Sequence, residues 1–207
     1  MIDTRTDSAS LTGGYELTPD RTIKMTYTYR NFFFDTAGNG NNSENHSIQL
    51  ALAERLSPTL SLDLSGGVTY GIDDDRYDWI ARAGITKTFQ GSSLNLGYSR
   101  DVTNTSGLTD ETSISDRLSM GWNFTLTRSF NLTISGNLSK NRSEPSARVD
   151  TTSYNASIGG EWQPYSWMRV GVGYSRFQQW ADGPLGEDLS RDQVFVNITV
   201  TPEGWRF

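Results

Sequence analysis

The chain has 207 residues, with 18 Lys and Arg against 24 Asp and Glu, and its net charge of −6 at pH 7 argues against a nucleic-acid partner. There is no Cys and a single His, which excludes disulfides and zinc–thiolate sites and leaves most His-based catalysis without partner residues. Apolar residues make up 35% of the chain and aromatic residues 12%, which is too aromatic for a disordered chain and too poor in aliphatic side chains for an ordinary soluble core.

Apolar and polar residues alternate along most of the chain, which predicts β-strands, because successive side chains of a strand point to opposite faces of the sheet. No segment has a sustained helical period, and apolar runs such as 32–34 fall far short of the ~20 residues of a membrane-spanning helix. The expected strands have about the length that crosses a membrane, ~9 to 11 residues. These eleven segments are 6–17, 22–33, 46–55, 59–70, 77–89, 93–102, 113–126, 130–139, 153–163, 167–177 and 192–201.

The segment 60–70 has the clearest pattern. Its even-numbered residues are apolar or Gly up to Tyr70, and its odd-numbered residues are polar or Gly, Asp63 among them. The segments 118–126 and 130–134 repeat the pattern on either side of the turn 127–129, which predicts a β-hairpin.

The connections alternate between short and long. Short turns are expected at 18–20, 57–59, 90–92, 127–129 and 164–166. Long polar loops are expected near 35–46, 71–76, 101–112, 140–152 and 178–191. Tight turns on one side and long loops on the other are typical of an outer-membrane β-barrel. The sequence therefore predicts an all-β, antiparallel, up-and-down transmembrane barrel in the bacterial outer membrane.

Alternation alone is also compatible with a soluble barrel that has an apolar interior. Aromatic residues favour the membrane, because they gather at the strand ends and leave an aliphatic band between them. Those expected beside the short turns are Tyr15, Phe89, Phe130, Trp162 and Trp167, and those towards the long loops are Phe33, Tyr70, Tyr77, Tyr98, Tyr154, Tyr174 and Phe177. With the apolar face outward, the charged residues expected to line the lumen are Lys24, Arg30, Asp63, Asp78, Arg82, Arg117, Glu161 and Arg169.

The odd number of strands indicates either an incomplete barrel or one misassigned segment, and the incomplete barrel is the simpler explanation. Single-chain bacterial barrels have an even number of strands with both ends in the periplasm, so 12 or more strands are expected in the complete protein. The chain also begins without a secretory signal sequence. We therefore interpret 1–207 as one barrel domain and as the C-terminal portion of a larger barrel, completed by missing N-terminal strands or by another chain.

The end of the chain, 194–200 followed by Trp205 and Phe207, resembles the last strand of bacterial outer-membrane barrel proteins, which typically finish on a Phe. The repeating pattern of 5–11 and 15–19 is similar to that of porin and exopolysaccharide-associated outer-membrane barrels. This resemblance implies that Trp205 and Phe207 form a signal for the barrel-assembly machinery. It also implies a role in polysaccharide export.

Two loop motifs carry possible chemistry. The segment 41–46 brings Ser43 and His46 together with Asn residues, as a barrel lipase would, but a triad needs a base that rigid elements orient, so a solvated loop is the favoured interpretation. Asp73, Asp74 and Asp75 could hold a hard cation, but they lack the pattern of a calcium loop and are interpreted as an acidic extracellular mouth.

The expected function is a passive pore or export conduit for polar solutes, with polysaccharide as the solute that the resemblance implies. Small residues at many lumen positions, as in 93–99 and 169–175, cannot fill a barrel of ~12 or more strands. The alternative is a non-conducting anchor or assembly protein whose loops bind a partner. No catalytic activity and no cofactor are expected, and the expected surroundings are outer-membrane lipids and lipopolysaccharide.

Overall fold

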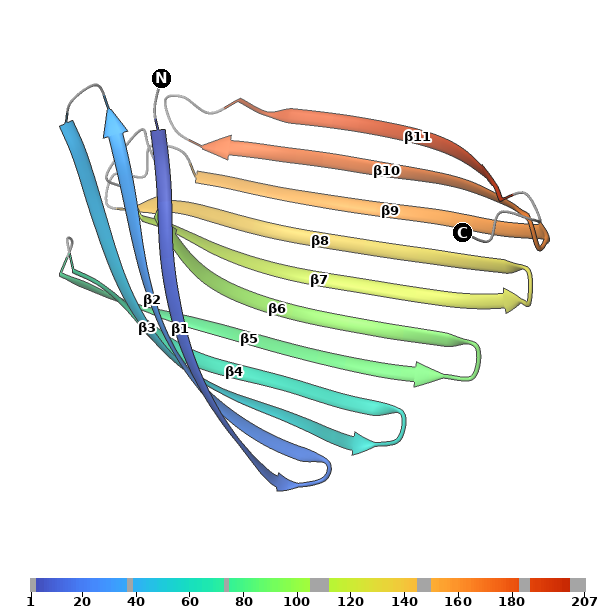
Figure 1. Ribbon diagram of the computed structural model, residues 1–207. Helices are drawn as coiled ribbons and strands as arrows, with labels where there is room; N and C mark the ends of the chain where they lie inside the picture. The colour runs from blue at the N-terminus through green and yellow to red at the C-terminus, as the bar shows by residue number, and fades with distance from the viewer. Residues whose placement is uncertain are drawn as a thin grey trace.

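The computed structural model describes residues 3–36, 39–72, 75–104, 112–144, 150–182 and 187–201, which form one sheet of eleven β-strands (Figure 1). Within these ranges no helix is long and apolar enough to span a membrane. The strands are β1 (Asp3–Thr18), β2 (Arg21–Thr36), β3 (Asn39–Ser57), β4 (Leu60–Gly71), β5 (Arg76–Phe89), β6 (Ser92–Asn104), β7 (Thr112–Thr127), β8 (Phe130–Glu144), β9 (Asp150–Tyr165), β10 (Met168–Asp182) and β11 (Leu189–Val200).

Every strand pairs with its neighbours in the sequence. The order in the sheet is β1 to β11 without a crossover, and neighbouring strands pair in antiparallel ladders. The short turns lie together at one end of the sheet and the longer connections at the other (Figure 1). Both the up-and-down topology and the eleven strands confirm the prediction from the sequence.

The sheet is curled but open. β1 passes in front of the middle strands in Figure 1, whereas β11 forms the opposite edge. Among the described residues no ladder joins β1 to β11, so each of these strands pairs on one side only. In the described residues the eleven strands therefore form a curled sheet with two open edges.

The register keeps each face uniform from strand to strand, because residues directly opposite each other share a face. Leu64 of β4 lies opposite Leu52 and Ala83, whereas Ser65 lies opposite Ala51 and Arg82. One row of the apolar face consists of Ile23, Leu52, Leu64, Ala83, Tyr98, Leu118, Leu138 and Tyr154. A register slip of one residue would move such a row to the polar face.

Two adjacent glycines of β4 show which face is concave. A Cβ at Gly67 would overlap the carbonyl oxygen of Ile48 in β3, because the curl brings that backbone over this face. A Cβ at Gly66 points to the other face and meets nothing within 4 Å. Gly67 belongs to the polar face of Ser65, and Gly66 to the apolar face of Leu64. The polar face is therefore concave, and the apolar face is convex.

These glycines give a matched prediction. We expect Gly67→Ala to lower the free energy of unfolding by ~1 to 3 kcal/mol, because the new methyl group must displace the backbone of Ile48. Gly66→Ala introduces the same methyl group into open space and serves as the control, with an effect of ~0.5 kcal/mol or less. Denaturant unfolding from lipid vesicles measures both. Equal effects would contradict the assignment of the concave face.

The apolar side chains of the convex face are exposed rather than packed into a core. Among the described residues only one apolar side chain is buried, Ile114, at 2% exposure. Large apolar side chains of the convex face are far more exposed, for example Leu50 at 57%, Leu118 at 55% and Val172 at 51%. Such a surface requires an apolar solvent, which a bilayer provides.

The strands extend further than expected at the end with the longer connections. β3 begins at Asn39 and β8 continues to Glu144, so much of the predicted loops 35–46 and 140–152 is paired strand. The alternation of apolar and polar residues stops there, but backbone hydrogen bonds between strands do not depend on it. The prediction of loop boundaries from alternation alone was wrong for this reason.

Candidate functional site on the concave face

The charged residues predicted to line the lumen share one face. The register places Lys24 opposite Ala51, Ser65 opposite Arg82, and Arg82 opposite Ser99, which in turn lies opposite Arg117. The remaining members follow by the two-residue period of their strands. All eight residues lie on the concave face: Lys24, Arg30, Asp63, Asp78, Arg82, Arg117, Glu161 and Arg169.

Several of these side chains form ion pairs across or along the concave face. Arg169 Nε lies 3.3 Å from Glu161 Oε1 between β10 and β9. Arg82 Nη2 lies 2.8 Å from Asp101 Oδ1, and these side chains are 61% and 40% exposed. Exposed pairs of this kind contribute only ~0 to 1 kcal/mol to stability. Their charges are therefore available to interact with water, ions and solutes.

A hollow of about 340 Å³ lies on the concave face where β2, β3, β4 and β5 meet. Lys24, Asp63, Ser65 and Arg82 contribute to its lining. Within the described part of the chain, neither Lys24 nor Asp63 forms a hydrogen bond or an ion pair. This part of the face therefore presents both signs of charge to a polar solute.

Short polar side chains cover the concave face between the charged residues. Ser135 and Ser157 hydroxyls lie 2.6 Å apart, and those of Ser139 and Ser153 lie 2.7 Å apart. The Thr86 hydroxyl donates to Asn95 Oδ1 at 2.8 Å. These side chains satisfy one another across neighbouring strands and extend little from the sheet. They leave the space in front of the concave face free for water or solute.

The convex face carries two groups of aromatic residues separated by aliphatic ones. At the long-connection end, Tyr70 and Tyr77 stack with ring centroids 4.6 Å apart. At the short-turn end, Tyr165 and Trp167 stack at 5.2 Å. Aromatic girdles around an aliphatic band mark the two headgroup levels of a bilayer. Phe177 does not belong to a girdle, since its register opposite Asn155 and Arg191 places it on the concave face.

The predicted acidic mouth and the predicted assembly signal lie mostly outside the described residues. Asp75 has a positive φ of 47° and accepts a hydrogen bond from the Tyr70 hydroxyl at 2.9 Å, whereas Asp73 and Asp74 lie outside the described residues. Trp205 and Phe207 also lie outside them.

His46 lies in β3, and its Nδ1 is 2.6 Å from the Tyr27 hydroxyl. Nowhere in the described ranges do three His, Asp or Glu side chains converge as metal ligands would.

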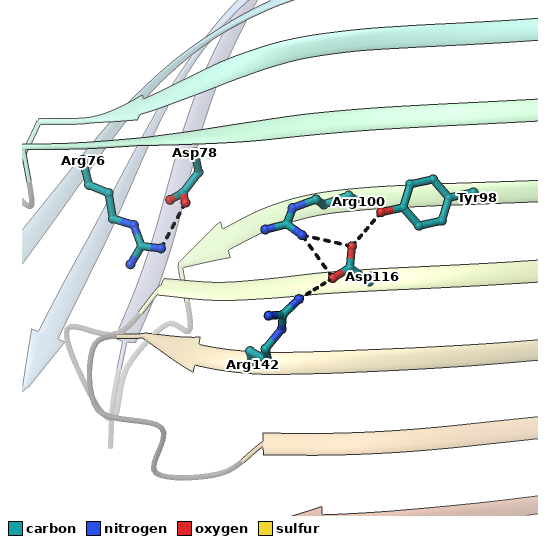
Figure 2. Close-up of polar contacts among 6 residues, drawn as sticks. All are labelled: Arg76, Asp78, Tyr98, Arg100, Asp116 and Arg142. Carbon is teal, nitrogen blue, oxygen red and sulfur yellow. Dashed lines mark hydrogen bonds and ion pairs between the residues drawn. The ribbon is translucent and has the colours of Figure 1, made fainter.

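Sequence reasoning missed a charged cluster on the convex face. Figure 2 shows Asp116 of β7 between Arg100 of β6 and Arg142 of β8, with the Tyr98 hydroxyl donating to Asp116 Oδ1 at 2.8 Å. Arg142 fell in an expected loop, so its side-chain direction was not considered. The available signal was parity, because Arg100 and Asp116 are even-numbered like their apolar neighbours Leu96 and Leu118.

Solved structures share this fold. The FrpB iron transporter from Neisseria meningitidis superposes with a TM-score of 0.69 and 9% identity, over 87% of this chain and 36% of its own. The outer membrane channel DcaP of Acinetobacter baumannii gives 0.63 and 10%, over 91% and 60%. In-vitro folded OmpT, an outer membrane protein of Vibrio cholerae, gives 0.50 and 8%, over 96% of each chain.

No family model matches the chain, and no curated protein matches its sequence. At these identities the structural likeness concerns the fold alone. It confirms the predicted β-barrel fold, which these outer-membrane proteins share. The chain spans about a third of the FrpB transporter and 60% of the DcaP channel.

Proposed function

We propose that residues 1–207 form part of the wall of an outer-membrane channel through which polar solutes pass passively. The β1 and β11 edges join further strands of the same protein or of another chain, and the concave face lines the aqueous passage. The observation that carries the proposal is the contrast between the two faces. Leu64, Leu118 and Val172 are exposed on the convex face, while Lys24, Asp63 and Arg82 lie together on the concave one.

The proposed passage is polar but not strongly selective by sign. Arg169 and Glu161 balance each other, as do Arg82 and Asp101. Small side chains such as Ser139 and Ser153 leave space between these pairs. A wall of this kind suits hydrated ions and neutral polar molecules, because it offers both hydrogen-bond donors and acceptors and has no single dominant charge. The proposal assigns no chemical reaction to the chain.

Single-channel recording tests the proposal. The protein isolated from membranes with all of its strands is expected to give stepwise conductance in a planar bilayer. A barrel whose passage is occluded, as in a non-conducting anchor, would give no steps and would overturn the proposal. Liposome swelling with oligosaccharides of increasing length then tests polysaccharide as the solute. If only short sugars enter the liposomes, the protein is a pore for small solutes and polysaccharide is not its solute.

Ion selectivity gives a further prediction. The sequence is acidic around the long connections, with Asp73, Asp74, Asp75, Asp110, Glu111, Asp182, Glu187 and Asp188. An acidic mouth concentrates cations over a Debye length of ~10 Å at 0.1 M salt. We expect a mild cation preference that weakens as the salt concentration rises. Changing residues 73–75 to Asn is expected to move the reversal potential towards anions, and anion preference of the unchanged pore would contradict the prediction.

A further inference from the structure

The convex cluster of Arg100, Asp116, Lys140 and Arg142 lies above the aliphatic band. On β8, ten residues separate Phe130, beside a short turn, from Lys140. At a rise of ~3.3 Å per residue and a tilt of ~40°, this distance is ~25 Å along the membrane normal, which is the height of the apolar band of such barrels. With Phe130 at one headgroup level, Lys140 therefore reaches the other. That level belongs to the outer leaflet, because it is on the long-connection side.

The cluster is built around one carboxylate. Asp116 lies directly opposite both Arg100 and Lys140 in the register. Arg100 Nη1 lies 3.3 Å from Asp116 Oδ2, and Arg142 Nη2 lies 3.0 Å from the same oxygen. The guanidinium of Arg100 also lies 4.0 Å from the centroid of the Trp79 ring, which fixes its plane. The arginines are thus held in place before any ligand arrives.

The cluster has more positive charge than Asp116 can neutralise. Three cations, Arg100, Lys140 and Arg142, lie near Asp116, and a second carboxylate, Asp150 of β9, lies on the same face two residues from Thr152, which pairs with Lys140, so one positive charge remains in surplus. Lys140 is exposed and, in the described part of the chain, forms neither a hydrogen bond nor an ion pair. Arg142 is 39% exposed and directs one terminal nitrogen to Asp116. Donors on a lipid-facing surface, at headgroup height, therefore remain available to an anion.

We propose that this cluster binds a phosphate monoester of a lipid in the outer leaflet. A phosphate monoester carries a charge of ~−1.5 to −2 near neutral pH, which is opposite in sign to the surplus of the cluster. Its oxygens accept charge-assisted hydrogen bonds from guanidinium and ammonium groups. The acyl chains of the same lipid lie along the aliphatic rows that continue below it through Leu138 and Leu118. The proposal depends on the convex face meeting lipid, but not on conduction.

The test uses the protein from outer membranes with all of its strands, stripped of lipid in mild detergent. Native mass spectrometry measures binding of lipid A with its phosphates, of lipid A without them, and of inorganic phosphate. We expect the phosphorylated lipid to bind at least tenfold more tightly than the dephosphorylated one. Inorganic phosphate at equal concentration is expected not to displace it. Equal binding of the two lipids, or displacement by phosphate alone, would overturn the proposal.

Matched variants separate the cluster from general basicity. The double change Lys140→Gln and Arg142→Gln is expected to weaken binding of the phosphorylated lipid at least tenfold. Lys87→Gln is the control, because Lys87 is a convex-face cation at the short-turn end, 5.9 Å from the Phe89 ring, and its loss is expected to change binding less than twofold. Unchanged binding in the double variant would overturn the proposal.

A folding control keeps the result interpretable. The charge-preserving Lys140→Arg is expected to bind the phosphorylated lipid within twofold of the unchanged protein, and its failure to bind in a heat-modifiable, folded state would count against the site. Single-channel conductance of the double variant is expected to stay the same, because the cluster faces away from the proposed passage. Loss of lipid binding with intact conductance therefore distinguishes this site from the proposed function.

Discussion

Replacing Leu64 by Arg is expected to lower the free energy of unfolding from lipid vesicles by about 2 to 4 kcal/mol. Leu64 lies on the convex face, four residues above the short turn before β4. With the strand rise and tilt of such barrels, that position is ~10 Å into the ~25 Å apolar band and therefore close to the bilayer midplane. A guanidinium at that depth either loses its hydration or draws water into the apolar band, and both cost free energy.

Ser65→Arg is the matched control at the same depth. Ser65 lies on the concave face, where its side chain accepts a hydrogen bond from Gln49 Nε2 at 2.9 Å. Arg82 lies directly opposite, so a second cation there is expected to cost ~1 kcal/mol or less through like-charge repulsion. Reversible denaturant unfolding compares the two variants. Equal costs, or a larger cost for Ser65→Arg, would overturn the outward orientation of the apolar face.

The second large effect concerns the open edges of the sheet. β1 and β11 each leave one row of backbone N–H and C=O groups without a strand partner in the described structure. In lipid each unsatisfied group costs several kcal/mol, so the cost of two open edges far exceeds the stability of a typical domain. We expect residues 1–207 alone to give little heat-modifiable, protease-resistant barrel in detergent.

A longer chain that supplies neighbouring strands is expected to restore folding. The gel-mobility shift on heating reports a closed barrel, and protease resistance reports complete pairing of the edges. Efficient refolding of residues 1–207 by themselves, with a full mobility shift, would show that β1 and β11 close on each other. That outcome would contradict the open wall and the incomplete strand count.

Strand parity was the part of the structure that the sequence could predict best. Lys24, Asp63 and Arg117 were assigned to one face from a two-residue period, and the register places them there. Residues that share a parity share a face because parity is local and a short turn fixes the register of each hairpin. Phe177 was assigned from its position near a strand end rather than from its parity, and its face was therefore wrong.

Convergence between strands was not predictable in the same way. Arg100, Asp116 and Arg142 are separated by connections whose lengths alternation does not define. Their meeting depends on the pairing of Arg100 with Asp116, and on β8 continuing past Lys140 to Glu144. Polar strand ends carry no periodic signal, because water satisfies either face there. Sequence reasoning therefore located the two faces of the sheet better than the charged cluster on the convex face.

The strictly sequential pairing of the strands has a consequence for how such proteins diverge. Since each strand contacts only the strands before and after it in the chain, a duplicated or deleted hairpin changes the circumference of the wall and leaves every other ladder in register. Gain or loss of two strands also keeps both chain ends on their original side of the membrane. Gain or loss of one strand would reverse the direction of every later strand. The hairpin is therefore the unit in which this architecture can grow or shrink during evolution.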